Sequence, residues 1–194
     1  MGLLAGGLYA GYQYEDASSV QEARIAMRRL LGDSESVILI NLGNLANTYQ
    51  LLGRTEQAIR MRRDVYSGSL KLRGEEHGDT ILAAYNYVVS LNELKRFEET
   101  KSVLRKPIPL ARRVLGESNE LTIKMRWNYA SALYKDDCAT LDDLREAVTT
   151  HEDLVQTARR VLGSAHPAAG TIGNSLRNAQ EALRARETPP PGSS

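Results

Sequence analysis

Residues 111–118 read ARRVLGES and residues 158–165 read ARRVLGSA, so six letters recur without change. A fainter copy, MRRLLG, occupies residues 27–32. Gly32, Gly74 and Gly116 follow one another at intervals of 42 residues, and Gly163 comes 47 residues after Gly116. A fixed period between about 20 and 50 residues is typical of a solenoid, in which each repeat packs only on its neighbours. The recurring phrase therefore predicts a repeat array.

The phrase has the composition of a helix end. Arg112 and Arg113 stand in the last turn, where cations complement the negative end of the helix dipole. Gly116 can take the left-handed C′ conformation without a steric penalty. We expect the apolar pair Val114–Leu115 to pack inward, and we expect Gly32 and Gly163 to stop their own helices in the same way.

Two helices fit between successive stops, because apolar residues recur there in steps of three and four. The first helix of each repeat is called helix A and the second helix B. The pattern predicts A helices at 39–53, 79–94 and 121–135, and B helices at 55–73, from 97 onward and at 141–162. Thr140 and Asp143 resemble a capping box. The five extra residues of the third repeat are expected to form an exposed, mobile loop at 136–140.

Two prolines interrupt helix B of the second repeat. Pro107 and Pro109 lie inside the stretch that the period requires to be helical. A proline in a helix interior costs about 3 kcal/mol, whereas the first helical position tolerates it. We therefore expect the helix to end near Arg105 and to restart at Pro107, with Lys106 leaving helical dihedral angles. Ile108 and the Val114–Leu115 pair should remain packed on the core.

The repeats resemble a known family. Leu45-Ala46-x-x-Tyr49 in helix A and Gln57-Ala58 in helix B are similar to the signature of tetratricopeptide repeats. The period of 42, together with R-R-x-L-G and His166-Pro167, is similar to the kinesin-light-chain type of repeat. The resemblance implies an all-α, right-handed superhelical solenoid of helix–turn–helix repeats, with about eight helices.

The predicted organisation follows from the period. An irregular N-terminal segment over 1–14, a remnant of an upstream repeat, precedes a repeat array over 15–186. The array consists of a leading half-repeat at 15–32, units near 33–74, 75–116 and 117–163, and a polar capping helix at 167–186. Residues 187–194, ending in PPPGSS, are expected to be a disordered tail.

One asparagine recurs in the A helices. Asn44, Asn86 and Asn128 each stand twelve residues after a stop glycine, although asparagine is a mediocre helix former. The resemblance implies that this asparagine points into a concave groove and bonds to the backbone of a bound peptide; the alternative is a hydrogen bond between neighbouring helices. The predicted peptide-binding residues are Asn44, Asn47, Tyr85, Asn86, Asn92, Lys124, Trp127, Asn128, Ser131 and Tyr134.

The composition of the chain argues against some classes of function. The formal net charge is +1, which argues against a dedicated binder of nucleic acid or of anionic membranes. The apolar start of the chain, MGLLAGGLYAGY, is too short to span a bilayer. The single cysteine, Cys138, rules out an internal disulfide and fits a reducing compartment, so a cytoplasmic location is expected.

No motif indicates catalysis. The string HEDLV at 151–155 lacks the second histidine of a zinc site, and His151 is expected to be structural because it lies on the apolar stripe of its helix. The aspartates at 136, 137, 142 and 143 lack the spacing of a calcium loop and are expected to be solvated loop or cap residues. We expect no cofactor and no metal. Glu76-His77 and His166-Pro167 are expected to begin helices.

The sequence therefore predicts a noncatalytic protein-interaction scaffold that binds an extended peptide or partner segment in its concave groove. The relatives that it resembles favour peptides with an aromatic residue in acidic surroundings. Two alternatives stay open. One is a structural segment of a longer array without a peptide ligand; the other, less favoured, is a nucleic-acid-binding helical repeat, since the arginine doublets could follow a phosphate backbone.

Overall fold

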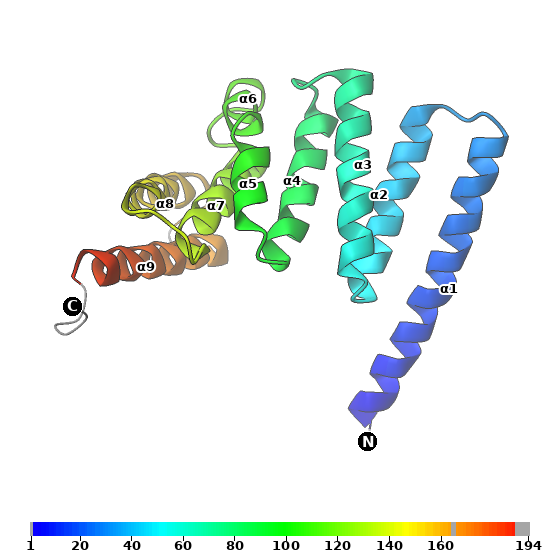
Figure 1. The fold of residues 1–194 in the computed structure, drawn as a ribbon, viewed down its shortest axis with the longest axis horizontal. Coiled ribbons are helices and arrows are strands. Elements are labelled where there is room, and N and C mark those ends of the chain that lie inside the picture. Colours follow the sequence, from blue (N-terminus) through cyan, green and yellow to red (C-terminus); the bar gives the residue numbers. More distant parts are fainter. Residues whose placement is uncertain (1, 164–165, 189–194) are drawn as a thin grey trace. The chain divides into compact units, whose positions relative to one another are not determined.

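A computed structural model describes residues 2–163 and 166–188. Within these ranges the chain forms helices joined by short turns (Figure 1). The helices are α1 (Gly2–Leu30), α2 (Glu35–Leu51), α3 (Thr55–Arg73), α4 (Gly78–Glu93), α5 (Phe97–Leu104), α6 (Pro107–Val114), α7 (Glu120–Lys135), α8 (Leu141–Leu162) and α9 (Pro167–Glu187). The prediction of a helical repeat array is confirmed. The described residues form one helix more than expected, because helix B of the second repeat is divided into α5 and α6.

The chain divides into two compact units, unit 1 over residues 1–90 and unit 2 over residues 91–194, with α4 crossing the division. In unit 1, α2 and α3 form an antiparallel hairpin, and α1 lies against α2 (Figure 1). Ile25 of α1 reaches into the cluster that Leu45, Tyr49 and Ala58 form between α2 and α3.

Unit 2 has two core clusters along α7, α8 and α9. One contains Ile123, Leu154 and Ile172, with Trp127 packed against it. The other contains Leu133, Ala147 and Ala179, with Tyr134 packed against it. The A helix α7 therefore packs both on its own helix B and on the following A helix, as expected of stacked helix hairpins.

The stop glycines take positive φ at each predicted position, with values of 73° at Gly32, 81° at Gly74, 95° at Gly116 and 89° at Gly163. Their backbones are not all left-handed helical, because ψ is 172° at Gly74 and 152° at Gly163. The positive φ explains why glycine recurs, since an L side chain is strained there. The left-handed C′ conformation predicted for Gly163 is therefore wrong.

The aliphatic residue two positions before each stop glycine does not pack inward as predicted. Val114 and Val161 are 42% and 41% exposed, and Leu115 is only half-buried. The buried residue of the phrase is its alanine, Ala111 or Ala158, which is fully buried. Residues four apart share a helix face, so Ala111 and Leu115 lie over one another while Val114 is rotated toward solvent.

The proline break is confirmed. Helix α5 ends at Leu104, and Pro107 is the first residue of α6. The expectation for Lys106 is wrong, because its φ of −87° and ψ of −47° remain in the helical region. The interruption therefore comes from the backbone N–H that Pro107 lacks, and not from non-helical dihedral angles at Lys106. Ile108 stays half-buried.

The expectations for the N-terminal segment and for the 136–140 loop are corrected by the structure. The N-terminal segment is not irregular over 2–14, because α1 already begins at Gly2. In the 136–140 loop, Asp137 and Cys138 are exposed as predicted, but Ala139 is buried and Asp136 is half-buried. The capping box is confirmed: Thr140 Oγ1 accepts from the Asp143 N–H at 3.1 Å, and Asp143 Oδ2 accepts from the Thr140 N–H at 2.9 Å.

Candidate functional site

The exposed face of the A helices in unit 1 combines amides with aliphatic side chains. Asn44 on α2 and Asn86 on α4 are both exposed. One turn earlier on each helix stand Ile40 and Leu82, which are 58% and 45% exposed. Residues four apart lie on the same face of a helix, so each A helix shows an aliphatic group beside its asparagine. The sequence reasoning missed Ile40 and Leu82, although both stand eight residues after a stop glycine.

Arg62 joins this face from helix B. Its Nη2 donates to Asn47 Oδ1 at 3.0 Å, and its Nη1 donates to the Asn86 carbonyl oxygen at 3.3 Å and to Ser90 Oγ. Arg62, Asn47 and Asn86 line a small hollow of about 20 Å³ in unit 1. The structure therefore brings Asn47 and Asn86 together, with a guanidinium between them. The reach of Arg62 across to the A helices has no signal in the sequence.

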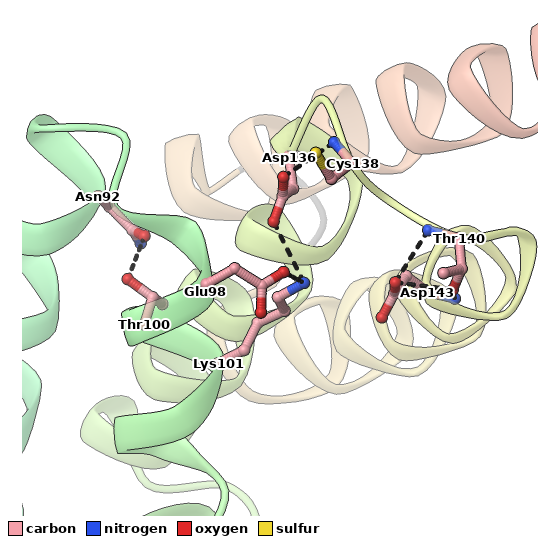
Figure 2. Close-up of polar contacts among 8 residues, drawn as sticks. All are labelled: Asn92, Glu98, Thr100, Lys101, Asp136, Cys138, Thr140 and Asp143. Atoms are coloured by element: carbon pink, nitrogen blue, oxygen red, sulfur yellow. Dashed lines mark hydrogen bonds and ion pairs between the residues drawn. The ribbon is translucent and has the colours of Figure 1, made fainter.

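In unit 2 the predicted asparagines bond to each other. Asn92 Nδ2 donates to Asn128 Oδ1 at 2.8 Å, and Asn128 Nδ2 donates to the Lys124 carbonyl oxygen at 2.8 Å. Thr100 Oγ1 donates to Asn92 Oδ1 at 2.7 Å (Figure 2). Asn92 and Asn128 thus tie the C-terminal end of α4 to α5 and α7. This is the interhelical role that stood as the alternative to peptide contact.

An apolar hollow of unit 2 lies between the starts of α7 and α9. Its volume is about 410 Å³. Ile123, Trp127, Val161, Ala168 and Ile172 give it apolar walls, and its polar lining residues are Ser118, Glu120, Lys124, His166 and Thr171. It contains two of the predicted site residues, Lys124 and Trp127, on one helix.

Hydrogen bonds and ion pairs fix the rim of this α7–α9 hollow. Trp127 Nε1 donates to Ser175 Oγ at 2.9 Å. Ser175 stands twelve residues after Gly163, so it occupies on α9 the position that asparagine holds on the other A helices. Lys124 Nζ lies 2.6 Å from Glu120 Oε1, and Lys124 lowers the pKa of that carboxyl group. The His166 side chain caps α9 by accepting from the Ala168 N–H, which confirms its expected place at a helix start.

The three remaining predicted residues are buried or half-buried. Ser131 is buried and Tyr85 is half-buried. Tyr134 packs edge to face on His151, with ring centroids 5.7 Å apart and an interplanar angle of 67°. These three side chains do not line the α7–α9 hollow.

His151 is a core residue. It is fully buried, and its Nδ1 lies 2.8 Å from the Ala147 carbonyl oxygen, one helical turn earlier. Burial lowers the pKa of its imidazole, against a smaller opposing effect of the Ala147 bond. An imidazole that packs edge to face on a tyrosine and bonds to its own helix has a structural role, as the sequence predicted.

Two aspartates near the loop have structural roles, Asp136 as an anchor of the loop and Asp143 as part of the capping box. Asp136 Oδ2 lies 3.2 Å from Lys101 Nζ, which also lies 2.5 Å from Glu98 Oε1 (Figure 2). The Cys138 N–H is the main cause that holds the pKa of Asp136 below its ordinary value, and Lys101 adds to it. Burial acts to lower the pKa of Lys101, but Glu98 and Asp136 outweigh it and leave that pKa raised. The expectation that Asp136 is a solvated loop residue is therefore wrong.

In residues 2–163 and 166–188, His, Cys, Asp and Glu side chains do not gather in threes that could hold a metal ion. None of the helices in that part of the chain is long and apolar enough to cross a membrane.

Comparison with known proteins places the fold. No protein-family model matches the sequence, and no curated protein sequence matches it. The structure is similar to a kinesin-light-chain-like protein of Podospora anserina with nearly identical TPR-like repeats, with a TM-score of 0.75 and 20% identity over 95% of this chain and 85% of that chain. A single-substitution variant of that protein gives 0.77 and 19% over the same shares. BtubC of P. vanneervenii gives 0.59 and 16% over 94% of this chain and 78% of that chain. The tetratricopeptide-like repeat fold that the resemblance implied is thereby confirmed.

Proposed function

We propose that this chain is a noncatalytic protein-interaction scaffold that binds an extended peptide or partner segment on the exposed faces of its A helices. The observation that carries the proposal is the α7–α9 hollow beside Trp127. Its volume of about 410 Å³ is in the range of ligand sites, which are typically about 300–1,000 Å³. Apolar walls with a few polar groups at the rim suit a bulky side chain of a peptide whose backbone stays outside.

The ligand that fits this hollow has an aromatic or large aliphatic residue. Trp127, Ile123 and Ile172 offer it apolar contact, and Lys124 at the rim offers a charge to an acidic neighbour. Glu120 already pairs with Lys124, so the acidic residue of a ligand would have to compete with that carboxylate. The preference for an aromatic residue in acidic surroundings is thus part of the proposal.

Unit 1 supports the same function with different groups. The amides of Asn44 and Asn86 can both donate to and accept from a peptide backbone. Ile40 and Leu82 add exposed aliphatic surface one turn away. Asn47 lies nearby but already accepts from Arg62, which makes it a weaker candidate.

A second function has its own support. The hydrogen bonds of Asn92 and Asn128 to each other and to Thr100 give the asparagine register a structural purpose in unit 2. A structural segment of a longer array would need those bonds and no ligand. For either function, the exposed free thiol of Cys138 suits a reducing, cytoplasmic location.

Selection from a displayed library of random peptides, with the full chain immobilised, tests the proposal. We expect enriched peptides whose binding is lost in Val161→Glu, because this change puts a charge into the wall of the α7–α9 hollow. Val114→Glu is the matched control: it has the same place in the repeat and nearly the same exposure, but it does not line the hollow. Equal loss in both variants, or no enrichment over a blank surface, would favour the structural segment.

A further inference from the structure

A second hollow in unit 2 is lined mainly by polar side chains. Its walls come from the break between α5 and α6, from α7 and from α8, and its volume is about 370 Å³; we call it the α6–α8 hollow. Three of its lining residues are arginines: Arg105 and Arg112 on either side of the break, and Arg126 on α7. It has no lining residue in common with the α7–α9 hollow, so the two hollows are distinct.

Arg126 stands at a position where the repeat needs no charge. It comes ten residues after the stop glycine Gly116. At the same distance from their own stop glycines, the other A helices have Leu42, Ala84 and Gly173. Arg126 is nevertheless only 8% exposed. A buried charge is costly unless it is paired and hydrogen-bonded, so the packing of the repeat does not account for an arginine here.

Ion pairs hold Arg126 in the wall of the hollow. Its Nη1 lies 3.4 Å from Glu117 Oε2, and its Nη2 lies 2.6 Å from Asp153 Oδ2. Glu117 also accepts from the Nε of Arg112. Because Glu117 is shared between two guanidinium groups, its single negative charge balances Arg112 only in part. Arg112 uses only its Nε in this pair, so its two Nη groups can still donate to a ligand.

Arg105 adds a guanidinium group that is not neutralised locally. It is exposed, and in the described part of the chain it forms no ion pair. It acts on Tyr129, which lines the same hollow: burial is the main cause that raises the pKa of the Tyr129 hydroxyl, Glu146 adds to this effect, and Arg105 opposes it. Tyr129 therefore stays protonated at neutral pH and can serve as a neutral donor.

We propose that the α6–α8 hollow binds a phosphate group. Arg105 and Arg112 supply the positive charge, and the hydroxyl groups of Tyr129 and Thr150 are neutral donors in the same lining. These donors come from different helices, which suits a group whose three oxygens point in different directions better than it suits a planar carboxylate. Glu146 also lines the hollow, and its charge opposes the anion and limits the affinity.

NMR titration of the ¹⁵N-labelled full chain with sodium phosphate, at constant ionic strength, tests the proposal. We expect saturable shifts of the Arg105 and Arg112 Nε–H signals, and a weaker response to acetate. Arg105→Gln is expected to weaken phosphate binding by about tenfold, as for the loss of one charge-assisted hydrogen bond. Glu146→Gln removes the opposing charge and is expected to strengthen binding by about two- to fivefold.

A second titration distinguishes the source of the phosphate group. A short peptide with one phosphoserine among alanines is compared with inorganic phosphate. Tighter binding of the peptide, with the same loss in Arg105→Gln, identifies a phosphorylated partner segment. Equal or weaker binding of the peptide identifies a free phosphate compound.

Arg63→Gln is the matched control. Arg63 and Arg105 both stand 31 residues after a stop glycine and both are exposed, but Arg63 does not line the hollow. The absence of a saturable response to phosphate, an equal response to acetate, or an equal loss in Arg63→Gln and Arg105→Gln would each overturn the proposal. These variants leave the lining of the α7–α9 hollow unchanged, so the outcome is independent of the function proposed for that hollow.

Discussion

A stop glycine and a helical glycine have opposite effects on stability. Gly116 has φ of 95°, which an alanine adopts at a cost of about 1–2 kcal/mol. Gly170 lies in α9 with open space around its Cβ position. We predict that Gly116→Ala lowers the free energy of unfolding by about 1–2 kcal/mol, whereas Gly170→Ala raises it by about 0.5–1 kcal/mol. Urea unfolding followed by circular dichroism measures both; equal effects would contradict the assignment of Gly116 as a stop.

His151 makes stability depend on pH. Its imidazole has an ordinary pKa of 6.5 in the unfolded chain and a lowered pKa in the folded one. Below pH 6.5 the unfolded chain therefore binds more protons, so the free energy of unfolding falls as the pH falls, by up to about 1.4 kcal/mol per pH unit. We predict that His151→Phe, which keeps the ring against Tyr134, loses less stability than the parent chain between pH 7.5 and 5.5.

Urea titrations at these two pH values measure the difference. His77 and His166 are present in both chains, so their contributions cancel in the comparison. An identical pH dependence in parent and variant would show that His151 is not held neutral by the fold.

Individual residues of the phrase show what periodicity can predict. The glycines were identified because positive φ selects one residue type, and this leaves a mark in the sequence. The burial of Val114 was predicted wrongly, because an apolar residue near a helix end does not show which face of the helix is turned toward the core. Ala111, three residues earlier, is the residue that is buried there. Side-chain partners such as Arg62 and Asn47 depend on rotamers and on which helix lies opposite, and the sequence carries no signal for either.

Among the elements, the 136–140 loop is anchored to α5. Asp136 accepts from the Cys138 N–H at 3.0 Å and pairs with Lys101. We predict that Lys101→Met speeds hydrogen exchange at the Cys138 and Ala139 amides, because Asp136 loses the cation that holds it. Lys106→Met is the control, because it removes an exposed lysine that takes no part in the ion pair with Asp136. Unchanged exchange in Lys101→Met would show that the loop holds its shape without the ion pair.

Helix boundaries followed from chemistry that acts locally. The bounds of α8 and the restart at Pro107 were predicted correctly, because a capping box and a missing N–H act within one turn. The bounds of α3 were also predicted correctly, because Gly53 and Gly74 take positive φ at the turns that flank it. The N-terminal segment was missed as a helix because Gly6, Gly7 and Gly11 read as loop residues.

For the whole molecule, the interval between glycines was sufficient to predict the repeat fold, since each repeat needs one stop and one hairpin. The right-handed superhelix stays a prediction. The candidate site was predicted in part: Lys124 and Trp127 share a hollow, whereas Asn92 and Asn128 bond to each other. A register of like residues shows that a position matters in every repeat, but it does not tell whether the position binds a neighbour or a ligand.

The measurement that tests the central claim most directly is the fluorescence of Trp127, the single tryptophan of the chain. A peptide selected on the immobilised chain is titrated into the parent protein and into Val161→Glu. The account predicts a saturable shift of the emission in the parent, because the ligand changes the surroundings of the indole ring, and a weakened or absent shift in the variant. A selected peptide that binds with full affinity while the Trp127 emission stays constant in both proteins would contradict it.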